Sequence, residues 1–171
     1  MTIQIDSREH KKERERIEKQ FDKLGIKHFV SKLFVADYMN LDNPRLVIDR
    51  KQDLSELCSN VCQQHERFRN ELIRAKENGI QIIILIEEPD IKSLVDVWFW
   101  ENPRKHAYKW KMINGHPWKV ESNKKPLQGK QLYKSLNTIE KRYGVRFEFC
   151  DKKNTGKKIA ELLGGDTDAG F

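Results

Sequence analysis

The stretch Leu46–Lys51 reads Leu-Val-Ile-Asp-Arg-Lys, and it decides the fold that we expect for this chain. Its three apolar residues, two of them β-branched, predict a buried strand. Because side chains alternate along a strand, Asp49 and Lys51 would share one face while Arg50 points to the other. A buried charge without a partner is costly, so a strand that ends on Asp-x-Lys either runs directly into a solvated surface turn or holds a metal ion.

A second strand end should bring another carboxylate to the same place. The apolar residues 28–35 lead into Ala36 and Asp37, and residues 40–45 have the Asn, Asp and Pro composition of a turn. Two strands joined by a short turn pair antiparallel, so we expect residues 28–35 to pair with residues 46–51 and to fold Asp37 back toward Asp49 and Lys51. Two carboxylates and a lysine suit Mg²⁺ or Mn²⁺ and the metal-assisted hydrolysis of a phosphodiester.

A third acidic element follows the first predicted strand, in which residues 2–5 alternate and lead into residues 6–9, Asp-Ser-Arg-Glu. This motif, followed by Ala-Asp-Tyr at 36–38, Asp-Arg-Lys at 49–51 and Asp-Leu at 53–54, resembles the nuclease domain of XPF-type structure-specific DNA endonucleases. That family carries Asp-x-Arg-Glu, Gly-Asp and Glu-Arg-Lys followed by Asp-Leu, in this order. The resemblance continues at residues 65–68, 84–87, 132–136 and 143–145, and it covers roughly residues 1–90 and 127–163.

The sequence departs from the family pattern at three positions. Ala36 stands where the family has glycine, Asp49 stands where it has glutamate, and Asp53 follows the lysine more closely than the family spacing has it. Aspartate keeps the charge of glutamate but shortens its reach by one methylene. This change bears on metal affinity and geometry more than on the class of reaction.

The resemblance implies a restriction-endonuclease-like α/β fold, of the PD-(D/E)xK type, with a mixed sheet flanked by helices. It also implies a metal-dependent DNA endonuclease that acts on branched, flap or fork DNA in repair or recombination. The catalytic residues carried over are Asp6, Glu9, Asp37, Asp49, Arg50 and Lys51. Asp37 and Asp49 would hold a Mg²⁺ or Mn²⁺ ion with the backbone carbonyl of residue 50, and Asp6 and Glu9 would hold a second ion or brace the first. Arg8 and Arg67 would contact phosphate, although Arg67 could also be an ordinary surface charge.

Two other functions compete with this one. The chain could be a non-catalytic DNA-binding or scaffolding subunit of a nuclease complex, but such copies would be expected to lose the carboxylates or the lysine, which are present here. It could also be a general nuclease for RNA or single strands. Family members often form homodimers or heterodimers and carry helix-hairpin-helix repeats after the nuclease domain. In this sequence, an insertion or a partner chain would have to replace those repeats.

Composition is consistent with a nucleic-acid partner. The 171 residues include 33 Lys and Arg against 26 Asp and Glu, a net charge of +7. We expect one domain over residues 1–163 and a flexible tail over residues 164–171. With no long apolar run and no signal-peptide pattern, we expect a cytoplasmic protein without membrane contact. The resemblance to a small stand-alone form of the nuclease domain suggests a bacterial or phage-encoded protein, or a nuclear one if the source is eukaryotic.

The remaining elements follow from periodicity. Helices are predicted over residues 8–24, 54–77, 128–143 and 156–163, and an edge strand over residues 145–149. The aliphatic residues 80–86 predict a central parallel strand covered on both faces. It ends at Glu87 and Glu88, which would either meet solvent or approach the metal.

An insertion at about residues 90–126 contains all four tryptophans, interleaved with lysines and arginines. One interpretation is a nucleic-acid surface on which bases stack and Lys109, Lys111 and Lys119 contact phosphates. The other is a lid or a partner-docking segment whose aromatic side chains are buried.

Overall fold

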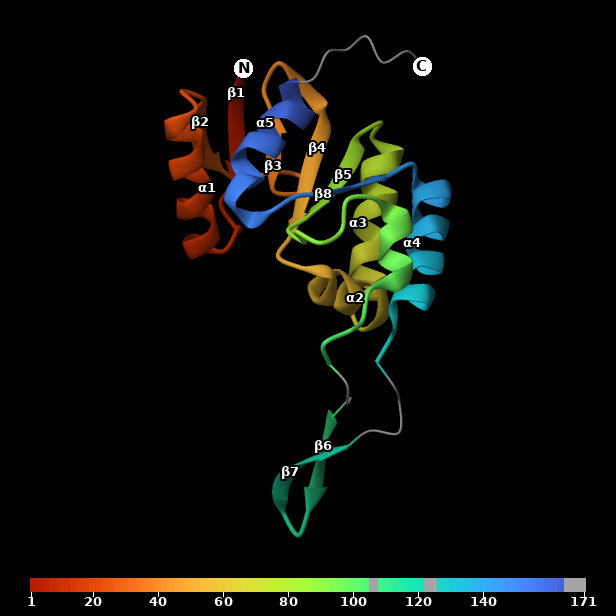
Figure 1. Cartoon of the computed structure of the whole chain (residues 1–171). Helices are drawn as coiled ribbons and strands as arrows, with labels where there is room; N and C mark the ends of the chain where they lie inside the picture. Colours follow the sequence, from red (N-terminus) through yellow and green to blue (C-terminus); the bar gives the residue numbers. More distant parts are fainter. Residues whose placement is uncertain (105–107, 122–125, 165–171) are drawn as a thin grey trace.

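The structure is a computed structural model that describes residues 1–104, 108–121 and 126–164 (Figure 1). Its strands are β1 (Thr2–Asp6), β2 (Lys27–Ser31), β3 (Tyr38–Asn40), β4 (Asn43–Lys51), β5 (Gln81–Ile86), β6 (Tyr108–Ile113), β7 (His116–Glu121) and β8 (Arg146–Phe149). Its α-helices are α1 (Lys11–Lys23), α2 (Leu54–Cys62), α3 (His65–Glu77), α4 (Gly129–Tyr143) and α5 (Thr155–Gly164), and its 3₁₀ helices are η1 (Leu94–Phe99) and η2 (Lys152–Asn154).

A six-stranded mixed sheet forms the body of the molecule, with the strand order β2-β1-β3-β4-β5-β8. Strands β4, β5 and β8 run parallel, β1 runs parallel to β2, and β3 is antiparallel to both of its neighbours. Helices α1 and α5 cover one face, and α2, α3 and α4 cover the other (Figure 1). This arrangement confirms the predicted α/β class with a mixed sheet flanked by helices.

The position of strand β5 in the sheet accounts for its aliphatic sequence. Ile83 and Leu85 are fully buried in the core under α1 and α5, while Ile82, Ile84 and Ile86 belong to the core under α2, α3 and α4. A strand buried on both faces has no position for a polar residue, which is why its hydrophobic run does not alternate. The predictions of a central strand at residues 80–86 and an edge strand at residues 145–149 are confirmed.

One predicted strand pairing is wrong. Residues 28–35 do not pair with β4, because β2 ends at Ser31 and lies parallel to β1 at the edge of the sheet. The partner of β4 is β3, with Tyr38 opposite Ile48. Burial explains this choice, since Tyr38 is fully buried whereas Phe29 and Val30 of the edge strand remain exposed. The turn predicted at residues 40–45 does join β3 to β4, so Asp37 still returns to the end of β4.

Two predicted helices have different limits. The helix expected over residues 54–77 is two helices, α2 and α3, interrupted at Gln63 and Gln64. The helix expected from residue 8 begins at Lys11, which leaves Arg8 and Glu9 in the turn that follows β1. The predicted tail of residues 164–171 lies outside the described residues except for the last residue of α5. Within the described part of the chain, no helix has the length and apolar character needed to cross a membrane.

The insertion divides into two parts. Helix η1 packs against α4, where the rings of Trp98 and Tyr133 lie 5.5 Å apart. The second part is the antiparallel hairpin β6–β7, drawn apart from the main sheet in Figure 1. Its two-residue turn, Asn114-Gly115, has φ values of 51° and 77°. Asn-Gly favours such turns, so this dipeptide is the sequence signal for the hairpin.

We predict that Gly129→Ala destabilises the protein. Gly129 begins α4 against the end of η1, and a Cβ there would collide with the backbone oxygens of Val97 and Trp100. The free energy of unfolding, measured by urea denaturation, should fall by about 1–3 kcal/mol because the backbone must move. The control Lys134→Ala, on the exposed side of the same helix, should stay within about 0.5 kcal/mol of wild type. Equal stability of the two variants would contradict the close packing of α4 on η1.

Candidate active site

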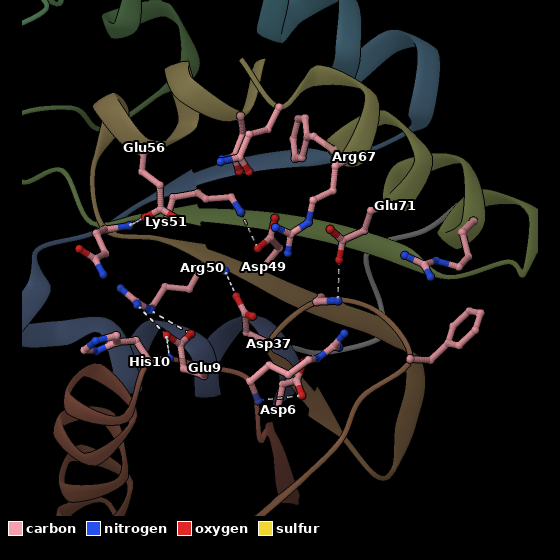
Figure 2. Close-up of a pocket in the computed structure, with 18 residues that line it drawn as sticks. Asp6, Glu9, His10, Asp37, Asp49, Arg50, Lys51, Glu56, Arg67 and Glu71 are labelled. Carbon is pink, nitrogen blue, oxygen red and sulfur yellow. Dashed lines mark hydrogen bonds and ion pairs between the residues drawn. The ribbon is translucent and has the colours of Figure 1, made fainter. Parts of the chain in front are cut away.

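A polar cleft of about 380 Å³ opens at the ends of β1 and β4, beside α3 (Figure 2). All six residues predicted to be catalytic line it, namely Asp6, Glu9, Asp37, Asp49, Arg50 and Lys51. Arg8 and Arg67, predicted to contact DNA, line it as well. Lys109, Lys111 and Lys119 do not, since they lie on the separate β6–β7 hairpin. The structure therefore brings all the predicted catalytic residues into one cleft, whereas three of the residues predicted to bind DNA lie outside it.

The alternation along β4 places Asp49 and Lys51 on one face, with Lys51 Nζ 2.9 Å from Asp49 Oδ1. The ammonium also lies 5.8 Å from the centre of the Phe68 ring on α3. Burial would by itself lower the pKa of Lys51, but the charges of Asp49 and Asp37 raise the pKa above its ordinary value. The lysine is therefore held as a cation beside a carboxylate, and it is not in a solvated surface turn.

Asp37 is held by backbone hydrogen bonds at the junction of three strands. Its amide donates to the Ile48 carbonyl (2.9 Å), and its carbonyl accepts from the Asp6 amide (2.8 Å). The Arg50 amide donates to the Asp37 carboxylate at 2.8 Å. Burial, followed by the charges of Asp49 and Glu9, raises the pKa of Asp37 well above its usual value. Asp37 and Asp49 are thus a closely spaced pair of carboxylates, as the turn chemistry predicted.

Ala36, just before Asp37, adopts a left-handed backbone conformation with φ of 62°. Side chains with a Cβ are strained in this region, whereas glycine is not. The Ala36 amide donates to the Glu71 carboxylate on α3 at 3.2 Å, which helps to hold this conformation. The position is the one at which the resembling family has glycine, and alanine in this conformation is strained.

We expect Ala36→Gly to raise the free energy of unfolding by about 0–1 kcal/mol, because relief of the left-handed strain outweighs the loss of a buried methyl group. The control Ala160→Gly, inside α5, should lower it by about 1 kcal/mol. Both values come from thermal and urea unfolding. If Ala36→Gly lowered the free energy of unfolding as much as Ala160→Gly does, the backbone at Ala36 would not be strained.

Arg50 points to the opposite face of β4, into a buried ion-pair network. Its guanidinium lies 2.9 Å from Glu9 Oε1 and 3.2 Å from Glu87 Oε2. The Glu87 side chain is fully buried and also contacts Arg16 of α1 and the Thr155 hydroxyl of α5. Burial would lower the pKa of Arg50, but Glu9 and Glu87 raise the pKa above its ordinary value. The network joins α1, α5, β4 and β5.

The network corrects the interpretation of Glu87 as a solvated strand end. Glu87 neither meets solvent nor lines the cleft, because its carboxylate pairs with Arg50 and Arg16. Glu13, which no sequence pattern had indicated, lies with Arg16 and Arg50 in the same network. No local pattern marks these residues, which come together only through the order of the strands.

We predict that Glu87→Ala lowers the free energy of unfolding by about 3–5 kcal/mol, because it leaves a buried guanidinium without one of its partners. The control Glu161→Ala removes an exposed pair with Lys157 and should cost no more than about 1 kcal/mol. Urea denaturation of both variants measures the difference. Equal losses would show that the Arg50 network does not stabilise the fold.

Asp6 is nearly fully buried and its carboxylate binds Arg8, with Nε 2.7 Å away. Arg8 in turn donates to the Leu33 carbonyl at 2.9 Å, so the pair holds the loop that leads to Asp37. In the described residues Asp6 and Glu9 are thus engaged with arginines, while Asp37, Asp49 and Lys51 face the cleft together. The assignment of Asp6 to a metal stays a prediction.

Helix α3 contributes a polar face that the sequence analysis recognised only at Arg67. Arg67 points into the cleft toward Asp49, and Glu71 lies beside it (Figure 2). Arg74 also lines the cleft, and its guanidinium carbon is 5.5 Å from the centre of the Phe34 ring. Arg67, Glu71 and Arg74 are spaced i, i+4 and i+7, which puts them on one side of a helix. This spacing was a usable sequence signal.

The donor set of the cleft is oxygen-rich, which fits Mg²⁺ or Mn²⁺ better than softer metals. Asp37 and Asp49 supply two carboxylates that repel one another, and a divalent cation would compensate this charge. Within the residues that the structure describes, no three His, Cys, Asp or Glu side chains already form a set that could hold a metal ion. Two carboxylates suffice for Mg²⁺, because it usually keeps several water ligands.

The mixed sheet has the restriction-endonuclease-like fold, with Asp37, Asp49 and Lys51 at its strand ends. The ERCC4 domain model matches residues 5–162, so the chain belongs to the ERCC4 domain family. A search of curated proteins finds no significant match.

Two solved structures share the fold. XPF from Aeropyrum pernix has a TM-score of 0.65 and 18% identity, over 99% of this chain and 66% of that one. XPF from Aeropyrum pernix in complex with DNA has a TM-score of 0.62 and 20% identity, over 95% of this chain and 63% of that one. This chain thus spans just under two thirds of the length of either.

Proposed function

We propose that this protein is a divalent-metal-dependent endonuclease that hydrolyses phosphodiester bonds in branched, flap or fork DNA during repair or recombination. The observation that carries the proposal is the meeting of Asp37, Asp49 and Lys51 in one open polar cleft. Family membership supports the reaction class. The net charge of +7 supports a polyanionic substrate.

In the proposed mechanism, the Asp37 and Asp49 carboxylates and the backbone carbonyl of Arg50 hold one Mg²⁺ or Mn²⁺ ion. When bound, such an ion polarises the scissile phosphate and lowers the pKa of a water molecule. The Lys51 ammonium orients that water or stabilises the charge that develops on the phosphate. Arg50 acts from the other face of β4, where its ion pairs keep Asp49 and Lys51 directed into the cleft.

The cleft also offers cations for the DNA backbone. Arg67 is exposed and points toward Asp49, and Arg8 lies at the cleft on the side of β1. We assign both to phosphates that flank the scissile bond. The preference for branched DNA rests on the family, and the Aeropyrum pernix structure with DNA supports DNA as the class of ligand.

The test is cleavage of labelled fork, flap, four-way-junction and linear duplex DNA with Mg²⁺, Mn²⁺ or EDTA. Wild type should cut a branched substrate only with metal, and Asp49→Ala and Lys51→Ala should each lower the rate by about 100-fold or more. Lys19→Ala, which removes an exposed lysine from α1, should cut like wild type. This control separates the loss of Lys51 chemistry from the loss of one positive charge.

Three outcomes would overturn the proposal or its metal dependence. Binding of these DNAs without cleavage, in wild type and variants alike, would favour the non-catalytic scaffold. Cleavage of RNA or single strands in preference to branched DNA would favour a general nuclease. Cleavage that persists in EDTA would rule out the metal.

A further inference from the structure

The β6–β7 hairpin exposes large apolar side chains to solvent on both of its faces. Trp110 is 72% exposed, Met112 65% and Trp118 58%. The interpretation of the insertion as a segment with buried aromatic side chains therefore fails for these residues. A two-stranded hairpin is marginally stable by itself, and exposed apolar groups gathered in this way mark a binding surface.

The register of the hairpin places each of these tryptophans opposite a lysine. Trp110 pairs with Lys119, and Lys111 pairs with Trp118. Residues directly opposite each other share a face, and successive residues point to opposite faces. Each face of the hairpin therefore carries one tryptophan–lysine pair. On one face, Lys119 Nζ also lies 4.7 Å from the centre of the Tyr108 ring.

The charge of the chain is concentrated in the hairpin and the residues that flank it in sequence. Residues 104–125 contain seven Lys and Arg residues and one glutamate, which is nearly the whole net charge of +7. The rest of the sequence is close to neutral. An anionic polymer complements such a segment, because each phosphate contact releases a counterion.

We propose that the β6–β7 hairpin is an arm that binds single-stranded DNA. An exposed indole stacks on an unpaired base, and the ammonium of the lysine opposite it contacts the adjoining phosphate. Bases in a duplex already stack on one another, so this surface favours unpaired strands. The inference deepens the proposed function and rests on it for the choice of DNA, because forks and flaps contain single strands.

The experiment measures binding of a fluorescently labelled 20-nucleotide oligo(dT) by anisotropy in EDTA, so that cleavage plays no part. Trp110→Ala and Trp118→Ala should each weaken binding about tenfold, which is within the range for loss of one stacked base. Trp110→Phe should retain most of the affinity, because phenylalanine also stacks. Lys111→Ala and Lys119→Ala should each make the dependence on salt shallower.

The matched control is Phe99→Ala. Phe99 is 79% exposed on η1, outside the hairpin, and its neighbours in a surface pocket include Asp53, Glu88 and Asp96. Its removal should leave oligo(dT) binding unchanged. Circular dichroism and the melting temperature should be those of wild type for every variant, since all the altered side chains are exposed.

If both tryptophan variants bound oligo(dT) as tightly as wild type, the proposal that the hairpin binds single-stranded DNA would be refuted. If Phe99→Ala weakened binding of oligo(dT) as much as the tryptophan variants do, base stacking by the hairpin would be refuted. The same holds if the tryptophan variants lost as much affinity for a linear duplex as for oligo(dT). The result is independent of catalysis. A wild-type protein that binds oligo(dT) through the hairpin but cuts no DNA would refute the proposed nuclease and leave the arm standing.

Discussion

The buried guanidinium of Arg50 is the constraint on which the site depends. A charge in this position requires partners, and Glu9 and Glu87 supply them from the turn after β1 and from the end of β5. With Arg50 fixed toward α1 and α5, alternation along β4 directs Asp49 and Lys51 to the opposite face, beneath α3. The network thus sets both the register of the strand ends and the side on which chemistry can occur.

Asp37 reaches this site through a strained connection. The left-handed residue before it, Ala36, turns the chain so that the Asp37 carboxylate meets the amide of Arg50. Glu71 from α3 and the Asp6–Arg8 pair hold the loop in place. Strain at a residue next to a functional group persists only where the surroundings fix it, and here hydrogen bonds from α3 and from the turn after β1 do so.

Local patterns predicted the centre of the site, and topology decided the rest. The alternation of residues 46–51 and the turn before them were enough to place Asp37, Asp49 and Lys51 together. The same reasoning paired residues 28–35 with the wrong strand, because sequence order does not show that β1 separates β2 from β3. Glu87, Arg16 and Thr155 meet over long sequence separations, so no periodicity could reveal that they surround one another.

In the proposed enzyme, the cleft and the hairpin divide between them metal binding and attraction of DNA, two electrostatic tasks that conflict in one place. A site that gathers a divalent cation needs carboxylates in excess, and Asp37 and Asp49, with Glu56 and Glu71 on the same walls, repel the phosphates of a substrate. Arg67 and Arg74 offset this repulsion at the cleft, but the sequence outside residues 104–125 is nearly neutral. Attraction at longer range must then come from the segment that holds the surplus charge. In the proposed enzyme, the hairpin gathers the nucleic acid, and the cleft, whose carboxylates and cations nearly balance, would hold the metal.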